Sequence, residues 1–486
     1  METQKPVIRT EKIVQFGEGN FLRAFVDWLV DITNEKTGFN GNVVLVQPLG
    51  QGMGDMINAQ KGLYTTVLRG VQEGKTVEEL RTINSVSRCI NPYGEYDTYM
   101  KLSESPDIRF VVSNTTEAGI AWRDGEKPDE KPQASFPGKI TAFLYNRYKH
   151  FAGAADKGLI FIPCELIDKN GDKLKEYVLR HIEEWKLGKD FTNWVLTACD
   201  FCNSLVDRIV PGYPKEEAER LCEKAGYQDN LLDAAEIFHL WVIETKRDWR
   251  KELPFTEAGL NVIWTDDMSF YRTRKVRILN GAHTMTVPAA FLYGLETVEE
   301  CIKDPLVIKF MKKGIFEEII PSMDGNKAEL EGYALDVLER FANPYIRHLL
   351  ISITLNSVSK FKTRDLPSII GYIQKKGTIP PALSFSLAAL IAFYEGTEIT
   401  DGSLSGKRKI GAYRIKDDLG VLERFASLYR DHGKDSAFIV RSVLSDVSWW
   451  EEDLTSYAGL ESAVLTHFNA IRNDGAKAAF GSVCGK

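Results

Sequence analysis

The amino-acid sequence predicts two domains: an α/β domain built on a mostly parallel sheet, followed by a mainly α-helical domain. A chain of 486 residues is long enough for two or three domains of about 100–200 residues each. In the first half, short apolar runs of strand length alternate with segments of helical periodicity, which is typical of buried parallel strands covered by helices. From about Tyr271 onward the periodicity is mostly helical. We therefore place the boundary near residue 265, giving domains of residues 1–265 and 266–486.

The elements of the first domain can be assigned in order along the chain. Residues 13–16 (IVQF) are predicted to form a short buried strand, and a glycine turn follows it. Residues 20–33 have apolar side chains at helical spacing. Further strands are predicted where apolar residues cluster, at residues 43–46, 109–112, 159–162, 195–196 and 262–264. In the second domain, the segments with the clearest helical spacing are residues 328–341 and 386–394.

Composition and charge exclude several classes of protein. Hydrophobic residues make up 44% of the chain and charged residues 27%, an ordinary globular balance. A net charge of −7 leaves no overall basic footprint for nucleic acid, and no apolar run approaches the ~18 residues that span a bilayer. Residues 1–12 are polar and lack the apolar core of a signal peptide, so we expect a cytoplasmic protein.

The cysteines predict neither a disulfide framework nor a metal site. Their number, seven, is odd, and the chain is long. Cys199 and Cys202 form one CxxC without a second pair of ligands at zinc-site spacing. We expect buried, reduced thiols, with a redox pair at this motif as the alternative.

The stretch IVQFGEGNFLRAF, residues 13–25, predicts a dinucleotide-binding turn. A strand, then Gly17 and Gly19, then a helix is the arrangement that binds a pyrophosphate in a Rossmann-like domain. Gly17 permits the tight turn, Gly19 lets the backbone approach the phosphates, and the helix N-terminus offers unpaired N–H groups. Leu22 stands where the motif has a third glycine, so a purely structural turn remains an alternative.

Two further segments are expected to line the cofactor. Gln47 follows the second strand, roughly where an acid usually binds the ribose hydroxyls. Because Gln47 replaces that acid and no arginine follows at once, residue chemistry leaves NAD and NADP both open. Ser113, Asn114 and Thr115 follow the strand at 109–112, at the edge of the sheet where Rossmann cofactors bind.

The segment KVRILNGAHT, residues 275–284, gathers three polar groups in an apolar helix. On α-helical geometry, with Lys275 at zero, His283 falls at about 80° and Asn280 at about 140°, so the three lie on one side. Gly281 costs about 1 kcal/mol relative to alanine in a helix, which suggests that something approaches the backbone closely there. A surface helix with a stray histidine is the alternative.

These motifs together resemble the mannitol dehydrogenase family, also called the polyol-specific long-chain dehydrogenases. The resemblance rests on GEGNF near the N-terminus, NSLVDRIVP at 203–211 and the Lys-x4-Asn-Gly-x-His spacing at 275–283, and it covers nearly the whole chain. Within the family, the chain is similar to the branch that reduces tagaturonate. That similarity rests on QFGEGNFLRAFVDW (15–28), GLYTTVLRG (62–70), SNTTEAGI (113–120), IPCELIDKNGD (162–172), VDRIVPGYP (206–214) and ILNGAHT (278–284).

The resemblance implies a role for each matching residue. Lys275 matches the general acid/base, a role for which burial or positive neighbours must weaken a lysine's hold on its proton; Arg272, Arg274 and Arg277 are close in sequence. Asn280 and Asn203 match amides that stabilise the oxygen on the reacting carbon, and His283 matches a residue that orients substrate. The pyrophosphate turn is matched by Gly17, Gly19, Asn20 and Phe21.

One departure from the mannitol-oxidising members bears on the substrate. Those members have a glutamate three residues before the lysine, where this chain has Arg272. In the segment NSVSKFKTR, residues 356–364, Lys360, Lys362 and Arg364 form a dense cationic set that could bind the carboxylate of a sugar acid. Solvated charges at the end of a surface helix are the alternative.

The resemblance therefore implies an NAD-dependent oxidoreductase that interconverts tagaturonate and altronate by hydride transfer, with a lysine as general acid/base and no metal. The alternatives are a fructuronate reductase, a mannitol-type polyol dehydrogenase and, in a different class, a dinucleotide-binding regulator without catalysis. We expect a small sugar acid as the only partner, with no nucleic acid, membrane or obligatory protein partner, so that a monomer would suffice.

Overall fold

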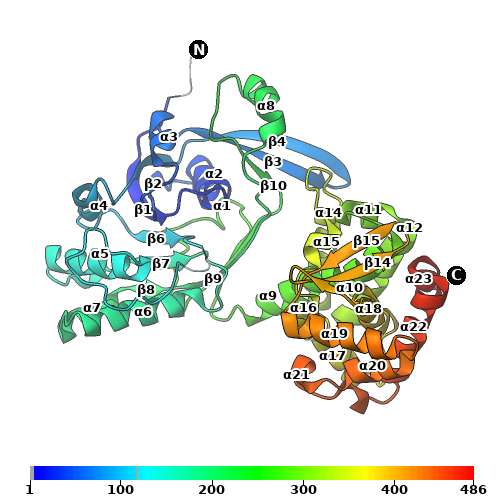
Figure 1. The fold of residues 1–486 in the computed structure, drawn as a ribbon. Coiled ribbons are helices and arrows are strands. Elements are labelled where there is room, and N and C mark those ends of the chain that lie inside the picture. Colours follow the sequence, from blue (N-terminus) through cyan, green and yellow to red (C-terminus); the bar gives the residue numbers. More distant parts are fainter. Residues whose placement is uncertain (1–4, 117–118, 486) are drawn as a thin grey trace. The chain divides into compact units, whose positions relative to one another are not determined.

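The structure, a computed structural model, describes residues 5–116 and 119–485 (Figure 1). The chain divides into two compact units. The first unit comprises Met1–Gly70 and Thr76–Met268, and the second comprises Val71–Lys75 and Ser269–Lys486. Glu117 and Ala118, part of the SNTTEAGI stretch, lie outside the described residues.

The core of the first unit is a six-stranded sheet whose strands all run parallel. The order β5-β2-β1-β6-β7-β8 becomes 3-2-1-4-5-6 when only the strands of this sheet are counted, which is the Rossmann order. The predicted α/β class is thereby confirmed. The strands are β1 (Thr10–Phe16), β2 (Gly41–Val46), β5 (Val86–Ile90), β6 (Phe110–Ser113), β7 (Ile160–Pro163) and β8 (Asp200–Phe201).

Helices cover both faces of this sheet. Successive side chains of a strand point to opposite faces, so the apolar strands present apolar side chains to a core on each side. On one face Ile13 packs in a cluster with Phe25 of the first helix, and on the other Val14 packs with Phe143. The first helix is continuous over residues 20–36 but contains a π-helical turn. The helices are α1 (Asn20–Leu22), η1 (Arg23–Asp27), α2 (Trp28–Lys36), α3 (Gly54–Ala59), α4 (Tyr96–Leu102), α5 (Phe136–His150), η2 (Ala155–Lys157), α6 (Asn170–Glu184), α7 (Lys189–Ala198), η3 (Lys215–Glu217) and α8 (Ala218–Ala225).

One predicted strand of the first unit is wrong. Val195 and Leu196 lie in the last turns of α7, and the strand begins later, with β8. Val195 is buried with Phe191 one turn earlier, whereas Leu196 is exposed, so the apolar pair belongs to an amphipathic helix. Two adjacent apolar residues carry no periodicity that could separate strand from helix.

Two smaller sheets complete the first unit. β9 (Asn203–Asp207) runs antiparallel to β11 (Leu240–Glu244), which runs parallel to β12 (Val262–Thr265). The register places Asn203 opposite Glu244. β3 (Tyr64–Gln72) lies between β4 (Lys75–Ile83) and β10 (Asp233–Glu236) in the other sheet.

The second unit is mainly helical, as predicted, around two apolar helices that pack together, α10 (Gly281–Tyr293) and α18 (Pro381–Phe393). The three-stranded antiparallel sheet β13 (Ile399–Thr400), β14 (Ser403–Arg408) and β15 (Gly411–Ile415) was not anticipated. The other helices are α9 (Ser269–Arg274), η4 (Lys275–Asn280), α11 (Val298–Lys303), α12 (Pro305–Lys312), η5 (Lys313–Ile319), α13 (Ile320–Ser322), α14 (Lys327–Phe341), α15 (Leu350–Ile353), α16 (Ser357–Arg364), α17 (Leu366–Lys376), α19 (Leu419–His432), α20 (Ser436–Leu444), α21 (Val447–Trp450), η6 (Leu454–Ser456), α22 (Leu460–Asp474) and α23 (Ala476–Cys484).

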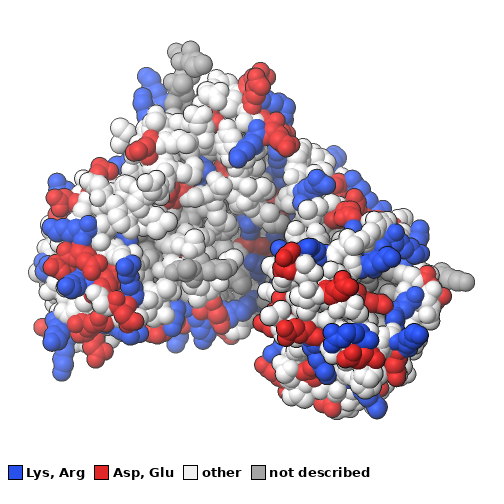
Figure 2. Space-filling model, viewed as in Figure 1, with Lys and Arg blue, Asp and Glu red and all other residues white. Residues whose placement is uncertain are grey.

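The surface carries both signs of charge. Figure 2 shows acidic and basic side chains intermixed on the visible face, without a continuous basic stripe. Among the described helices, none combines the length and apolar character needed to cross a bilayer.

Candidate active site

The glycine turn between β1 and the first helix has two different requirements. Gly17 has a φ of +123°, which side chains with a Cβ rarely adopt, and a Cβ there would lie 3.0 Å from the Asn114 carbonyl oxygen and 3.1 Å from Leu22 Cδ1. Gly19 precedes the helix and faces open space. The turn thus needs glycine at 17 for its own conformation, while Gly19 leaves the helix N-terminus open to an anion.

Arg23 is a buried residue that fastens this turn, and sequence analysis missed it. Its guanidinium donates to the Glu18 carbonyl at 3.2 Å, the Asn20 Oδ1 at 2.7 Å and the Leu231 carbonyl at 2.6 Å. Oδ1 of Asn20 is therefore engaged within the turn itself. An arginine followed four residues later by Asp27 on the buried face of an apolar helix was the available signal.

Phe21 also contributes packing. Its ring stacks on that of Phe25 with centroids 5.1 Å apart and packs against the core. In the predicted pyrophosphate set, the two glycines shape and open the turn, and the side chains of Asn20 and Phe21 stabilise it. Contact between these four residues and a cofactor stays a prediction.

Gln47 lies at the end of β2, as predicted, but its amide closes its own loop. Nε2 donates to the Leu49 carbonyl at 2.7 Å, and Oε1 accepts from the Gly54 N–H at 3.1 Å. Glu18 approaches the same loop and accepts from the Met53 N–H at 3.3 Å, and burial raises the pKa of Glu18. Contact between Gln47 and a ribose stays a prediction.

The residues that follow β6 are organised by Glu165, which sequence analysis did not single out. Its carboxylate accepts from the Thr115 N–H at 2.9 Å, the Thr115 hydroxyl at 2.8 Å and the Ser113 hydroxyl at 3.0 Å. Asn114 donates to the Cys164 carbonyl at 3.4 Å. Burial raises the pKa of Glu165. An acid directly after the apolar run LIFIPC was the signal that could have revealed it.

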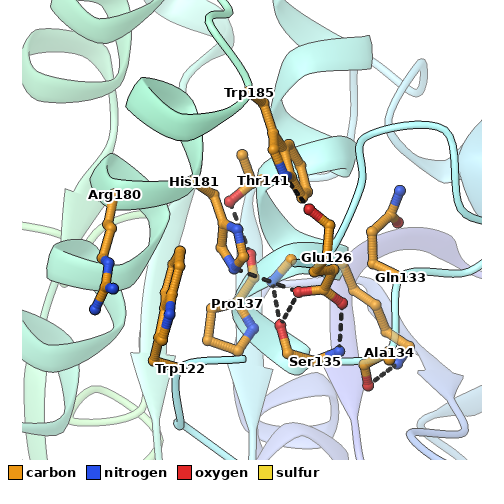
Figure 3. A network of polar contacts seen from close by, with 12 residues as sticks. Trp122, Glu126, Gln133, Ala134, Ser135, Pro137, Thr141, Arg180, His181 and Trp185 are labelled. Carbon is orange, nitrogen blue, oxygen red and sulfur yellow. Dashed lines mark hydrogen bonds and ion pairs between the residues drawn. The ribbon is translucent and has the colours of Figure 1, made fainter. Parts of the chain in front are cut away.

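The loop that leads from Thr115 to α5 is anchored by a second buried carboxylate (Figure 3). Glu126 accepts from the Ser135 N–H at 2.6 Å and from the Ser135 hydroxyl at the N-terminus of α5. His181 of α6 lies with Nε2 3.4 Å from Glu126 Oε2, its ring between those of Trp122 and Trp185 at 4.5 and 4.7 Å. Burial lowers the pKa of His181. These contacts tie the described part of the loop to α5 and α6.

Asn203 is buried at the start of β9 with its amide fully engaged. Oδ1 accepts from the Asp172 N–H at 3.0 Å, while Nδ2 donates to Asp172 Oδ2 at 3.1 Å and to Glu244 Oε1 at 2.8 Å. Glu244 in turn accepts from the Met268 N–H at 2.8 Å. Two carboxylates therefore hold the N–H groups that an oxyanion role would use.

In the second unit, Lys275 and Asn280 are the first and last residues of the π-helical segment η4, rather than of an α-helix. The Gly281 N–H bonds to the Val276 carbonyl, five residues back. The expected separation of about 140° between Lys275 and Asn280 assumed α-helical geometry and is wrong. A π-turn closes over five residues, so it stacks these two side chains one turn apart.

The close approach expected at Gly281 exists, and the approaching group is a carboxyl. A Cβ on Gly281 would lie 2.8 Å from Asp365 Oδ1. Asp365 is fully buried between α16 and α17. Sequence analysis did not single it out, and an acid next to Arg364 gives no signal of burial.

His283 is buried in the first turns of α10 among aromatic rings. Its centroid lies 4.1 Å from that of Phe341 and 5.1 Å from that of His348. His348 thus joins the candidate site. Burial lowers the pKa of His283 well below its usual range, and it also lowers the pKa of His348.

Positive charge surrounds His283. His348, Arg364, Arg340 and Lys360 all act in the same direction on its pKa. Arg364 donates to the Thr284 hydroxyl at 3.0 Å, and Lys360 to the Ile353 carbonyl at 2.9 Å.

The third predicted cation, Lys362, has a different partner. It pairs at the surface with the exposed Glu451, at 2.7 Å. The structure therefore groups Lys360 and Arg364 with His283 and leaves Lys362 apart.

Two of the arginines near Lys275 in sequence are engaged elsewhere. Arg274 pairs with Glu329 at 2.7 Å and stacks over Tyr333. Arg277 donates to the hydroxyls of Ser368 at 2.6 Å and Ser322 at 2.8 Å.

The cysteines take no part in the site. All seven are free and buried, and burial raises the pKa of Cys199 to about 12. Within residues 5–116 and 119–485, no cluster of histidine, cysteine and acidic side chains could hold a metal ion.

Comparison with known proteins assigns both units to domains of one protein family. Residues 11–256 match the model of the mannitol dehydrogenase Rossmann domain, and residues 267–472 match the mannitol dehydrogenase C-terminal domain. An altronate oxidoreductase of Cronobacter sakazakii is 47% identical over 478 residues, covering 98% of this chain and 97% of that protein. An altronate oxidoreductase of Escherichia coli has the same identity and coverage. The predicted resemblance is confirmed.

Solved structures share the fold at lower identity. A D-sorbitol dehydrogenase in substrate-free form is 22% identical with a TM-score of 0.77, covering 97% of this chain and 95% of that one. Mannitol 2-dehydrogenase of Pseudomonas fluorescens, in a ternary complex with NAD and D-mannitol, is 21% identical with a TM-score of 0.64, covering 98% and 94%.

Proposed function

This chain belongs to the mannitol dehydrogenase family, and we propose that it interconverts D-tagaturonate and D-altronate as an NAD-dependent oxidoreductase. The observation that carries the substrate choice is the positive charge around His283, supplied by Arg364, Arg340 and Lys360. A sugar acid brings a carboxylate that such a cluster can neutralise, whereas a polyol brings none. The relatives named altronate oxidoreductase, at 47% identity over nearly the full chain, support the same substrate pair.

The first unit suits NAD as the cofactor. Gly17 gives the turn its conformation, Gly19 is open, and the helix that begins at Asn20 presents unpaired N–H groups toward a pyrophosphate. NADH, when bound, supplies the hydride for reduction of the ketone. Ser113, Asn114, Thr115 and Gln47 remain proposed cofactor residues, in part through backbone groups, since their side chains already have protein partners.

The residues of η4 carry the proton chemistry in this proposal. Lys275 gives a proton to the oxygen on the reacting carbon during reduction and takes it back during oxidation. Asn280, one π-turn away, donates a hydrogen bond to that oxygen as charge develops. Asn203 of the first unit is the proposed second amide, and one of its acidic partners must release an N–H for that role.

The substrate's far end belongs to the His283 cluster. Tagaturonate has its ketone and its carboxylate toward opposite ends of a six-carbon chain, so the two need separate sites. Arg364 and Lys360 are proposed to bind the carboxylate, and His283, neutral because burial lowers its pKa, to accept or donate a hydrogen bond to a hydroxyl. Lys362, paired with Glu451, is left out of this set.

The proposal includes a cytoplasmic location, where NADH is available as reductant, and a small-molecule substrate as the only partner that the reaction needs. A monomer is sufficient for it.

The test is NADH oxidation followed by absorbance, with tagaturonate, fructuronate and fructose offered in parallel and NADPH as the alternative reductant. Fast turnover of tagaturonate with NADH supports the proposal. A preference for fructuronate corrects the substrate and keeps the mechanism. Turnover of fructose alone refutes the carboxylate argument, and cofactor binding without turnover of any sugar points to a non-catalytic binding protein.

A further inference from the structure

Asp365 is a fully buried acid at the junction of α16 and α17, pressed against the segment that carries the candidate catalytic residues. Its side chain is 0% exposed, and its Oδ1 occupies the space beside Gly281. Neither carboxyl oxygen accepts a hydrogen bond from any residue in the described ranges. A buried, ionised carboxylate without partners is costly, so this acid needs an explanation.

Two arginines act on Asp365 by charge, yet the guanidinium group of each donates to hydroxyl groups. Arg277 of η4 binds Ser368 and Ser322, and Arg364 of α16 binds Thr284, the neighbour of His283. Both guanidinium charges favour the ionised form of Asp365, and Asp365 acts back on both. An ionised carboxylate that interacts electrostatically with two guanidinium groups would be expected to bind one of them directly.

Burial has the largest influence on whether Asp365 is protonated or ionised. It raises the pKa of Asp365 well above the usual range, ahead of the opposing charges of Arg364 and Arg277. Burial and the lack of hydrogen-bond partners in the described part of the chain thus both favour the uncharged, protonated form of Asp365. In that form it takes no share of the charge of Arg364, which is left to act on an anion in the His283 cluster.

We propose that Asp365 is a positioning residue that sets how strongly Arg364 binds the carboxylate of the substrate. As a neutral acid against Gly281, it leaves Arg364 available; as an anion, it competes with the substrate for the same guanidinium. The inference rests on the proposed sugar-acid substrate and adds a control on its affinity.

The direction in which KM changes with pH follows from the ionisation of Asp365. Raising the pH ionises Asp365, so KM for the sugar acid should rise on the alkaline side while KM for NADH stays constant. Other groups near the cluster must be separated from this effect. His283 and His348 have lowered pKa values and stay neutral there, but Lys360, whose pKa is also lowered by burial, loses its charge at alkaline pH and raises KM as well.

The deciding experiment compares pH profiles of kcat and both KM values for the wild type and Asp365→Asn, which keeps the shape and cannot ionise. We expect the wild-type KM for tagaturonate to rise more steeply with pH than that of Asp365→Asn, so that the KM of the variant is roughly fivefold lower at the alkaline end of the profile. Lys360→Arg keeps its positive charge at alkaline pH. Introduced into both the wild type and Asp365→Asn, it removes the rise in KM that loss of the Lys360 charge would cause.

A matched control is Glu318→Gln. Glu318 is another buried acid of the second unit, with a pKa raised to about 7 by burial, but it accepts hydrogen bonds from the N–H groups of Ala382 and Leu383 in α18. Its profile for KM should match the wild type. Should Asp365→Asn fail to fold, Asp365→Ser, smaller and also uncharged, replaces it.

Parallel wild-type and Asp365→Asn profiles, with normal turnover, overturn the inference and leave the proposed function intact. Failure of the proposed function looks different, because the wild type itself would then not turn over tagaturonate at any pH.

Discussion

The two units differ in the charge that their candidate ligand-binding side chains carry. In the first unit, the side chains of Gln47, Ser113, Thr115 and Asn203 are all bound to other protein groups. In the second unit, the surroundings of His283 collect positive charge that the nearby buried acid does not bind.

The contrast indicates two ways of recognising a ligand. The first unit offers backbone to its ligand, at an open glycine and a helix N-terminus, and uses side chains to hold that backbone in shape. The second unit offers positive charge, which suits an anionic ligand. Variants that change backbone should therefore affect the cofactor, and variants that change charge should affect the sugar acid.

The largest effect is expected for Lys275→Ala, which removes the proposed proton donor. Without it, kcat should fall by about 10²–10⁴-fold, while the dissociation constant of NADH, measured by fluorescence titration, changes little. Lys303→Ala, at an exposed lysine paired with Glu299, serves as the control. Loss of NADH binding in Lys275→Ala would contradict the assigned role.

Arg364→Ala tests the charge half of the comparison. Loss of one charge-assisted contact should raise KM for tagaturonate by about 10–100-fold, with KM for NADH unchanged. Lys362→Ala is the matched control, since Lys362 is on the same helix but pairs with Glu451. Equal effects of the two variants on KM would show that the cations act only through long-range electrostatics and not by direct contact.

The two glycines of the turn test the backbone half. Gly19→Ala should weaken NADH binding by about tenfold with little change in Tm, because its Cβ enters open space on the ligand side. Gly17→Ala should also lower Tm, since a φ of +123° and contacts at 3.0 Å and 3.1 Å are incompatible with a Cβ. An unchanged affinity for NADH in Gly19→Ala would remove the turn from the cofactor site.

A smaller effect is expected below the turn, at Asp27. Burial raises the pKa of this acid to about 8, so the folded state holds a proton that the unfolded state releases near pH 4. Its contribution to stability is therefore complete below about pH 4 and is lost as pH rises toward 8. Asp27→Asn should flatten this part of the pH dependence of the free energy of unfolding by up to about 1.4 kcal/mol per pH unit, measured by denaturant titration. An unchanged slope would show that Asp27 is ionised in the folded protein.

Patterns that repeat along the chain made the fold predictable. Apolar runs separated by helical segments predicted the α/β class, and the spacing around Gly17 located the first turn. The predicted strand at Val195 and Leu196 is wrong because two residues are too few to show a periodicity. The partners of Asn203 and the burial of Glu165 and Asp365 depend on residues distant in sequence, and single-sequence patterns do not report such contacts. The grouping of Lys360 and Arg364 apart from Lys362 follows from helical spacing, which was available in the sequence.

The π-turn at Lys275–Asn280 indicates how this segment of the helix evolved. A helix whose hydrogen bonds skip five residues where an α-helix skips four contains one surplus residue. Such a segment is what a single-codon insertion into a regular helix would leave behind. Deleting Val276 should let the segment revert to a regular α-helix, in which the lysine and the asparagine, then four residues apart, still lie about one turn apart on the same face. The surplus residue would thus have been gained without turning the rest of the helix, and relatives without it should keep both side chains on one face.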